Sequence, residues 1–177
     1  MAILQNYFMV VRPAEAAERS AKWVAEKATE AGVQKTESGL LYKVIVAGDM
    51  TRVAKSDEDV VKVHYEGKLQ NGKVFDASRF NKRSKEQQEL MRRLQPSLFD
   101  EKGNILKEEP LEFSLSQVIK GWAEGMKLVG PGGKIILYVP AELAYGARGA
   151  GSDIGPNEAL EFEVELIDVN PAKNITE

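Results

Sequence analysis

The feature that most constrains the fold is an alternating strand followed by a turn and a short return strand. Val61, Val63 and Tyr65 alternate with polar residues, which places these three side chains on one face of the strand. Asn71-Gly72 accepts the positive φ angles of a two-residue type I′ turn, so the chain is expected to reverse there. The return strand carries Phe75-Asp76 back beside Tyr65. An apolar wall with one phenol and one carboxylate suits a mostly hydrocarbon ligand that carries a carbonyl group.

Composition excludes several classes of function. The 177 residues are 43% hydrophobic, enough for one good core, so one domain with an appendage is expected. The net charge of −3 is spread over mixed acidic and basic residues, which argues against nucleic-acid binding. The chain has no cysteine and a single histidine, His64, so thiol chemistry, a histidine-built metal site and a Ser-His-Asp triad are all disfavoured. We expect no cofactor and no metal, and assign His64 a structural role.

The first residues give only a weak targeting signal. Residues 3–11 are apolar but short, and no basic residue precedes them, so they make a poor secretion signal and cannot span a bilayer. We expect a cytoplasmic protein if Met1 is the native start, and a periplasmic one if a signal peptide has been removed.

Residues 13–31 are predicted to form a helix, because Pro13 suits a first turn, alanine dominates the interior and Gly32 suits the position after the end. Its apolar side chains form a narrow stripe: Ala17, Ala21, Val24, Ala28 and Ala31. Such a stripe is typical of a helix that packs on another helix. We interpret it as a homodimerising arm; the alternative is a helix docked on its own domain.

The rest of the chain predicts an α+β domain. Strands are expected at residues 41–46, 59–69, 74–76, 111–115, 134–139 and 159–169, and a short helix at 117–126. An antiparallel sheet with this helix against its apolar face is the simplest arrangement. The polar segment 34–39 marks the boundary, which gives an arm at 1–38, a domain at 39–170 and a tail at 171–177.

Residues 79–110 read as a charged insertion into this domain. Residues 84–94 are compatible with a helix, which Pro96 would end. The turn at 100–104 lacks the residue order of a calcium loop, so calcium is rejected there. Two interpretations remain: a lid or partner-binding flap over the nearby site, or a solvated decoration.

The motifs, in chain order, are Val63-His64-Tyr65-Glu66-Gly67 with Phe75-Asp76-Ala77-Ser78, Gln117-Val118-Ile119-Lys120-Gly121-Trp122, residues 130–134, Ala144-Tyr145-Gly146 and Phe162-Glu163-Val164-Glu165-Leu166. In this order and spacing, residues 39–169 resemble the FKBP-type (macrolide-binding) peptidyl-prolyl cis-trans isomerase family. The helix ahead of them is similar to the bacterial branch in which a helical arm precedes the isomerase domain. Taken singly, each aromatic residue here is more often core than ligand contact.

The resemblance implies a sheet half-wrapped around a short helix, with a pocket that receives a proline ring. Trp122 would form the floor, and the Ile119 N–H and Tyr145 hydroxyl would hold carbonyl groups of the substrate, while Asp76 would bind Tyr65 or the ligand. The walls implied by the resemblance are Tyr65, Phe75, Val118, Ile119 and Phe162, with Leu111 and Ile154 as further contacts. Leu111 stands where the family commonly has an aromatic residue, which puts macrolide affinity in doubt.

The implied activity is rotation about X-Pro bonds, which needs no nucleophile, metal or cofactor. The implied partners are proline-containing peptides, unfolded protein clients and macrolide inhibitors, without a nucleic acid and without a membrane span. An alternative is a non-catalytic chaperone or client-binding module that uses the same cleft. A third possibility is an assembly protein that uses the alanine stripe.

Overall fold

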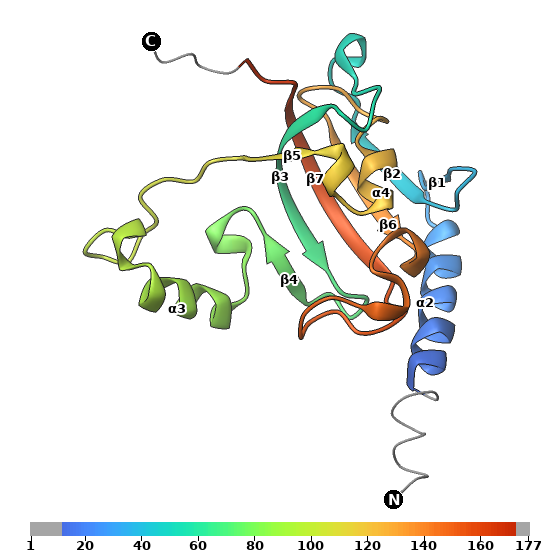
Figure 1. Ribbon diagram of the computed structural model, residues 1–177, viewed down its shortest axis with the longest axis horizontal. Helices are drawn as coiled ribbons and strands as arrows, with labels where there is room; N and C mark the ends of the chain where they lie inside the picture. Colours follow the sequence, from blue (N-terminus) through green and yellow to red (C-terminus); the bar gives the residue numbers. More distant parts are fainter. Residues whose placement is uncertain (1–11, 173–177) are drawn as a thin grey trace, which may run out of the picture.

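A single antiparallel sheet organises the fold. The computed structural model describes residues 12–172, and its strands run in the spatial order β1-β2-β6-β7-β3-β4, with β5 also paired to β3 (Figure 1). The strands are β1 (Gln34–Lys35), β2 (Leu41–Val46), β3 (Val60–Lys68), β4 (Val74–Ala77), β5 (Leu111–Ser114), β6 (Lys134–Val139) and β7 (Leu160–Val169). Within the described residues, three α-helices accompany them, namely α2 (Arg12–Ala28), α3 (Lys85–Leu94) and α4 (Lys120–Gly125). The expected α+β class and antiparallel sheet are confirmed.

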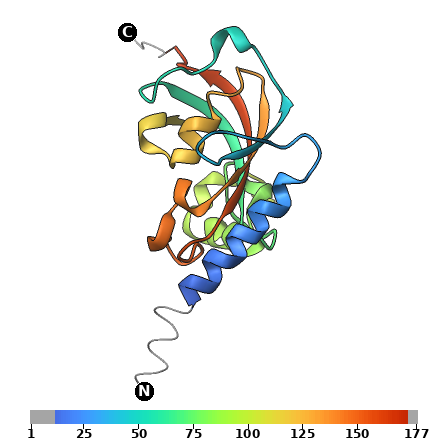
Figure 2. The same cartoon turned by 90° about the vertical axis from the view of Figure 1, so that its right-hand side faces the viewer.

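Helix α4 packs on the apolar face of the sheet, where the core lies (Figures 1 and 2). Gly125 allows the close approach, since a Cβ there would stand 2.6 Å from Leu137 of β6. The expected helix over 117–126 is interrupted. A 3-10 turn covers Leu115–Gln117, and Val118 and Ile119 are extended before α4 begins.

Strand β7 shows the predicted alternation. Its even-numbered residues from Leu160 to Leu166 are at most 4% exposed, while the glutamates between them lie on the other face. β7 lies between β6 and β3, so its apolar inner face is at the centre of the sheet, and its hydrogen bonds connect the two strands on either side.

The hairpin between β3 and β4 differs from the predicted type I′ turn. Gly72 has φ +87°, but Asn71 does not have the positive φ that a type I′ turn needs, since the only non-glycine residues with a positive φ in the described chain are Asn157 and Asn170. The Gly72 N–H donates to the Leu69 carbonyl and the Leu69 N–H to the Lys73 carbonyl, both at 2.9 Å. The loop is therefore a three-residue turn with a left-handed glycine, the next commonest hairpin geometry.

Helix α2 ends at Ala28, three residues before the predicted end. The Thr29 hydroxyl donates to the Glu26 carbonyl and Gly32 adopts φ +81°, which turns the chain toward β1. The helix is docked on its own domain: Ala16 and Ser20 are buried, and Trp23 meets the Tyr138 ring edge-on at 5.8 Å. The docked alternative is thus the arrangement observed, while dimerisation stays a prediction.

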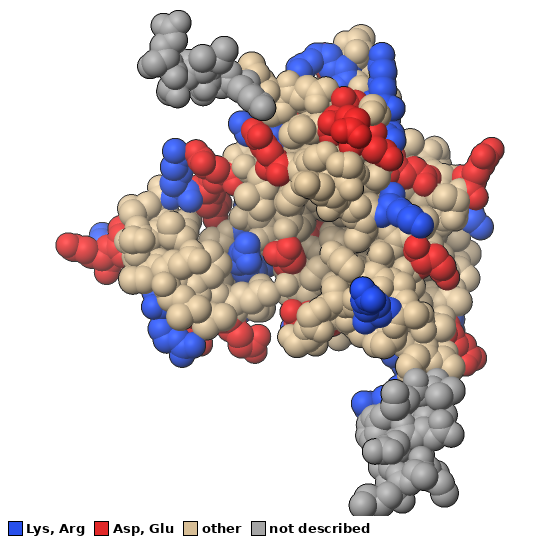
Figure 3. All heavy atoms as spheres, viewed as in Figure 1, with Lys and Arg blue, Asp and Glu red and all other residues tan. Residues whose placement is uncertain are grey.

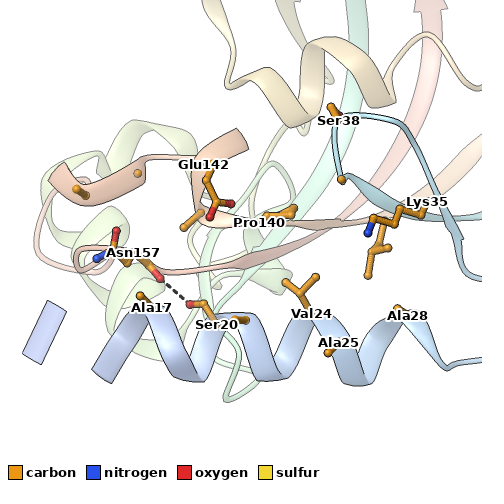
Figure 4. A pocket seen from close by; sticks show the side chains of 16 residues that line it. Ala17, Ser20, Val24, Ala25, Ala28, Lys35, Ser38, Pro140, Glu142 and Asn157 are labelled. Atoms are coloured by element: carbon orange, nitrogen blue, oxygen red, sulfur yellow. Dashed lines mark hydrogen bonds between the residues drawn. The ribbon is translucent and has the colours of Figure 1, made fainter. Parts of the chain in front are cut away.

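The alanine stripe borders a hollow of about 650 Å³ between α2 and residues 140–157 (Figure 4). Val24 faces Pro140 across it, and the helix side chains that line it are small.

Strands β4 and β5 share one edge of β3. Ala77 pairs with Glu66 and Leu111 pairs with Val63, whereas β7 occupies the other edge. The segment between them forms a lobe that projects from the sheet and contains α3 (Figure 1). Within the lobe the Phe80 and Phe99 rings pack 5.0 Å apart with the Arg92 guanidinium 4.9 Å from the Phe80 ring.

Acidic and basic side chains are interspersed over the face of the molecule seen in Figure 3. No helix within residues 12–172 is long and apolar enough to cross a membrane. In the same range, no group of three or more His, Cys, Asp or Glu side chains is placed to hold a metal ion.

Candidate active site

Trp122 is the centre of an aromatic cluster on the inner face of the sheet. It is the third residue of α4, and it is 4% exposed because the helix presses it against the strands. The rings of Tyr65, Phe162 and Phe113 meet it edge-to-face, with centroids 5.2, 5.6 and 5.9 Å away. Edge-to-face contact is a favoured arrangement of aromatic rings, so the cluster is a stable wall.

Phe75 joins the cluster from β4 through the Phe162 ring, 5.8 Å away. Gly67 of β3 makes this contact possible. A Cβ at Gly67 would stand 2.6 Å from the Phe75 ring and 2.9 Å from the Phe162 ring. The Phe75 and Phe162 rings occupy the space that a side chain at position 67 would fill.

One phenol and one carboxylate face each other across the hairpin, as the sequence predicted. The Tyr65 hydroxyl donates to Asp76 Oδ2 at 2.5 Å. Burial, together with the Asp76 carboxylate, raises the pKa of Tyr65 well above its ordinary value of 10.0. Burial also raises the pKa of Tyr145, again with Asp76 as the further cause. Both hydroxyls therefore remain protonated donors at neutral pH.

These side chains enclose a hollow of about 430 Å³. The residues that line it are Tyr65, Phe75, Asp76, Phe113, Gln117, Val118, Ile119, Trp122, Tyr145 and Phe162. The hollow is smaller than the one beside α2, but of these two it is the one in which aromatic rings, a carboxylate and two phenols converge. Such convergence on an apolar concavity is typical of a small-ligand site.

The hollow contains eight of the ten site residues expected from the sequence; Leu111 and Ile154 do not line it. Leu111 is 40% exposed at the start of β5, where the preceding chain leaves toward the lobe. Ile154 is 6% exposed, and its backbone pairs with Ala150, so its side chain belongs to the core. The proposed contacts from these two residues are therefore not supported by their positions.

Phe113 and Gln117 line the hollow and were not predicted as site residues. The signal for Phe113 was present, because residues two apart in a strand share a face and Leu111 had been given as a contact of the pocket. Gln117 carried no such signal. Its place depends on the 3-10 turn that ends the segment after β5.

The lobe contacts the wall of the hollow at two points. Gln87 of α3 donates from Nε2 to the Phe75 carbonyl at 2.8 Å, while its buried Oε1 has no hydrogen-bond partner. Arg83 Nη1 lies 3.7 Å from Asp76 Oδ1, so Asp76 has Tyr65 on one oxygen and a guanidinium near the other. The insertion thus braces the two residues that the return strand contributes.

His64 lies away from the hollow, on the opposite face of β3. Its Nδ1 is 2.9 Å from the Ser78 hydroxyl, which also accepts from the Tyr65 N–H. Burial, with the Arg79 charge, lowers the pKa of His64. This geometry supports the structural role that the sequence indicated.

The comparisons agree with this geometry. Residues 51–167 match the sequence model of a family described as "FKBP-type peptidyl-prolyl cis-trans isomerase", and residues 7–44 match one described as "Domain amino terminal to FKBP-type peptidyl-prolyl isomerase". The first match includes every residue that lines the hollow.

Curated relatives cover most of the chain. A "Probable FKBP-type peptidyl-prolyl cis-trans isomerase" of Haemophilus influenzae is 43% identical over 89% of this chain and 54% of its own length. The "FKBP-type 22 kDa peptidyl-prolyl cis-trans isomerase" of Escherichia coli is 40% identical over 84% of this chain and 58% of its own. The chain thus spans little more than half the length of these relatives.

Among solved structures, the crystal structure of FkpA from Escherichia coli superposes with a TM-score of 0.72 at 37% identity, covering 95% of this chain and 65% of that one. A peptidyl-prolyl cis-trans isomerase from Pseudomonas syringae gives a TM-score of 0.67 at 28% identity, covering 89% of this chain and 96% of that one. The chain belongs to the bacterial FKBP-type peptidyl-prolyl cis-trans isomerase family, in the group with an additional N-terminal domain.

Proposed function

We propose that this chain is a peptidyl-prolyl cis-trans isomerase that binds the proline of an X-Pro bond over Trp122. The observation that carries the proposal is the aromatic hollow of about 430 Å³, with Trp122 at its centre and the Tyr65–Asp76 pair in its wall. A five-membered ring fits such an apolar concavity, and its carbonyl neighbours find donors at the rim. The family match of the residues that form the hollow supports the same activity.

Catalysis would come from the environment of the amide rather than from covalent chemistry. Resonance gives X-Pro rotation a barrier of about 18–20 kcal/mol, so the spontaneous reaction takes tens to hundreds of seconds. The twisted amide has a less polar carbonyl than the planar one and therefore loses less on leaving water. An aromatic hollow favours the twisted form for this reason.

Two groups at the rim would hold the flanking chain while the bond rotates. The Tyr145 side chain is 39% exposed beside the hollow, and its hydroxyl keeps its proton. Ile119 lies immediately before α4, whose first turn uses its carbonyl as an acceptor from Trp122 and Ala123. We assign the Ile119 N–H and the Tyr145 hydroxyl to substrate carbonyl groups, which lowers the entropy cost of reaching the transition state.

A protease-coupled assay on X-Pro peptides tests the activity. Phe75→Ala and Asp76→Asn are expected to lower kcat/KM roughly tenfold. Asp57→Asn is the matched control, since that carboxylate contacts Lys127 at the surface. The rate should also be nearly constant from about pH 6 to 9, because rotation about the X-Pro bond transfers no proton. An unaccelerated wild-type reaction refutes the proposal.

A second function, holding unfolded clients, is favoured by the lobe. Its surface carries leucines that are 40% to 65% exposed, namely Leu90, Leu94, Leu98 and Leu106. The lobe is braced against Phe75 and Asp76, so an apolar client segment can lie on it while its proline occupies the hollow. This arrangement supports the lid or partner-binding interpretation over simple decoration.

The holding function predicts that Leu94→Ser with Leu106→Ser weakens suppression of client aggregation while leaving rates on short peptides unchanged. Val46→Ser is the control, because Val46 is 50% exposed on β2, outside the lobe. Equal suppression by all three proteins would argue against a client surface on the lobe.

The remaining proposals concern organisation and ligands. We propose an arm at 1–38, an isomerase domain at 39–170 and a tail at 171–177, with the alanine stripe of the arm as the contact of a homodimer. Macrolides would occupy the same hollow as proline, and competition with an X-Pro peptide measures this. The exposed Leu111 gives them little support at one wall.

A further inference from the structure

Ser20 of α2 lies at a buried junction of three segments. Its hydroxyl donates to the Asn157 carbonyl at 2.6 Å and accepts from the Ala159 N–H at 2.9 Å and from Gln70 Nε2 at 2.8 Å. Ser20 is 5% exposed and is one of only two buried residues of α2, and Figure 4 shows its bond to Asn157. The hydroxyl uses both its proton and its lone pairs, so it is fully satisfied.

Each of the three residues that bond to Ser20 lies next to a segment that contributes a side chain to the aromatic hollow. Gln70 lies in the turn between β3 and β4, and β4 carries Phe75. Ala159 immediately precedes β7, on which Phe162 is the third residue. One side chain of the arm therefore joins the ends of both strands whose rings meet over Gly67.

Asn157 makes the third connection, to the loop that presents Tyr145. Its N–H donates to the Gly146 carbonyl at 2.8 Å, next to Tyr145 in the chain. Its side chain Nδ2 donates to the Pro13 carbonyl at 3.0 Å, in the first turn of α2. Asn157 is held at φ +59°, a conformation that few residues other than glycine adopt, so contacts with the arm help to define the loop.

We propose that Ser20 is a positioning residue of the isomerase site. Through the Ser20 hydroxyl, the docked arm fixes the position of the Tyr145 loop and of the β3–β4 turn. The inference rests on the proposed function, in which the Tyr145 hydroxyl contacts the substrate. Loss of the hydroxyl loosens the rim without removing any group that touches the substrate. Binding of the X-Pro peptide then weakens, while the environment of the rotating bond over Trp122 is kept.

The test compares Ser20→Ala, Ser20→Thr and Arg19→Ala in the full chain. Ser20→Ala is expected to raise KM about three- to tenfold with kcat nearly unchanged. It should also speed hydrogen exchange of the Asn157 amide roughly tenfold. Ser20→Thr keeps the hydroxyl and should restore both values. Arg19→Ala is the control, since its side chain is exposed and reaches Glu158 only at 4.0 Å.

A second variant keeps the inference testable if Ser20→Ala does not fold. Asn157→Gly keeps the left-handed backbone but removes the Pro13 contact, and it should raise KM in the same direction. An unchanged KM in folded Ser20→Ala, or an equal rise in Ser20→Ala and Ser20→Thr, overturns the positioning role. The exchange measurement does not depend on activity. If the wild-type protein is inactive but Ser20→Ala still speeds exchange of the Asn157 amide, the proposed function is refuted while the structural link from Ser20 to Asn157 stands.

Discussion

At the scale of single residues, the shape of the hollow depends on the missing side chain of Gly67 as much as on the aromatic rings around it. Phe75 and Phe162 come from different strands and meet above this glycine, within 3 Å of where a Cβ would stand. Protein interiors are packed densely, so a methyl group here has no free volume to occupy. The wall that we assign to proline binding is therefore sensitive to the smallest possible enlargement of β3.

Gly67→Ala is expected to push the Phe75 ring away from Phe162 and lower kcat/KM on X-Pro peptides roughly tenfold. Overpacking of this kind also costs about 1–3 kcal/mol of stability, which urea denaturation measures. Gly72→Ala in the nearby turn is the comparison, because nothing lies within 4 Å of its Cβ position and any loss there reflects its positive φ alone. Equal activity of Gly67→Ala and wild type would contradict the proposed role of this wall.

Tyr65 predicts how stability changes at alkaline pH. Its pKa is raised in the folded chain, chiefly by burial, so the folded state keeps a proton that the unfolded state loses above its ordinary value of 10.0. The associated stability is complete below about pH 10 and is lost as the pH rises further. Tyr65→Phe should reduce this loss in thermal denaturation between pH 8 and about 11. Tyr42→Phe is the control, because the Tyr42 hydroxyl donates to the amide oxygen of Gln34 and not to a carboxylate. Identical pH profiles would contradict the prediction.

At the scale of elements, the lobe acts on the hollow through α3. Ser84 caps the helix by accepting from the Gln87 N–H at 3.2 Å, which fixes the first turn. Gln87 then donates to the Phe75 carbonyl in β4. A strand of four residues with few ladder bonds of its own gains a donor from this helix.

Gln87→Leu should lower kcat/KM several-fold, because the Phe75 carbonyl loses its donor and the wall loosens. The net change in stability should stay within about 1 kcal/mol, since the same substitution removes the buried Oε1 that has no partner. Gln88→Leu is the matched control, as its Nε2 bonds to the Arg83 carbonyl inside the lobe. Equal losses in both variants would mean that the lobe acts only through its own folding.

The elements also show what the sequence could and could not predict. Alternation located β7 and β3 correctly, because a strand with one buried face has apolar and polar residues in turn along its sequence. The turn at Asn71-Gly72 was predicted with the wrong geometry, since the same two residues serve a two- or a three-residue loop and the register between β3 and β4 distinguishes them. Phe113 was missed although its strand was expected. The docking of α2 depends on Ser20, whose role no local pattern reveals.

At the scale of the whole molecule, the arm docks on its own domain and also lines the hollow between α2 and that domain. The docked face includes Ala16, Ser20 and Trp23, while Ala17, Ala21 and Ala28 remain exposed. Small side chains allow close approach of a second helix, so the two packing modes are compatible. The homodimer that we propose is therefore compatible with the docked arm.

Val24→Asp places a charge in the stripe and should shift the protein from a dimer to its 19.6 kDa chain in sedimentation or light scattering. Lys22→Asp is the control, because Lys22 is exposed and does not line the hollow beside α2. A wild-type protein that is monomeric at micromolar concentration would refute the dimer and leave the docked arm unaffected.

The shared edge of β3 has a consequence for how this family can change. Ala77 and Leu111 flank the lobe and lie opposite residues only three apart on one strand, so the lobe enters and leaves the sheet at nearly the same place. The entropy of closing a loop rises only with the logarithm of its length. Evolution can therefore exchange the lobe for a short linker or another module without changing the order of the strands, as long as the new segment replaces the contacts of Gln87 and Arg83 with β4.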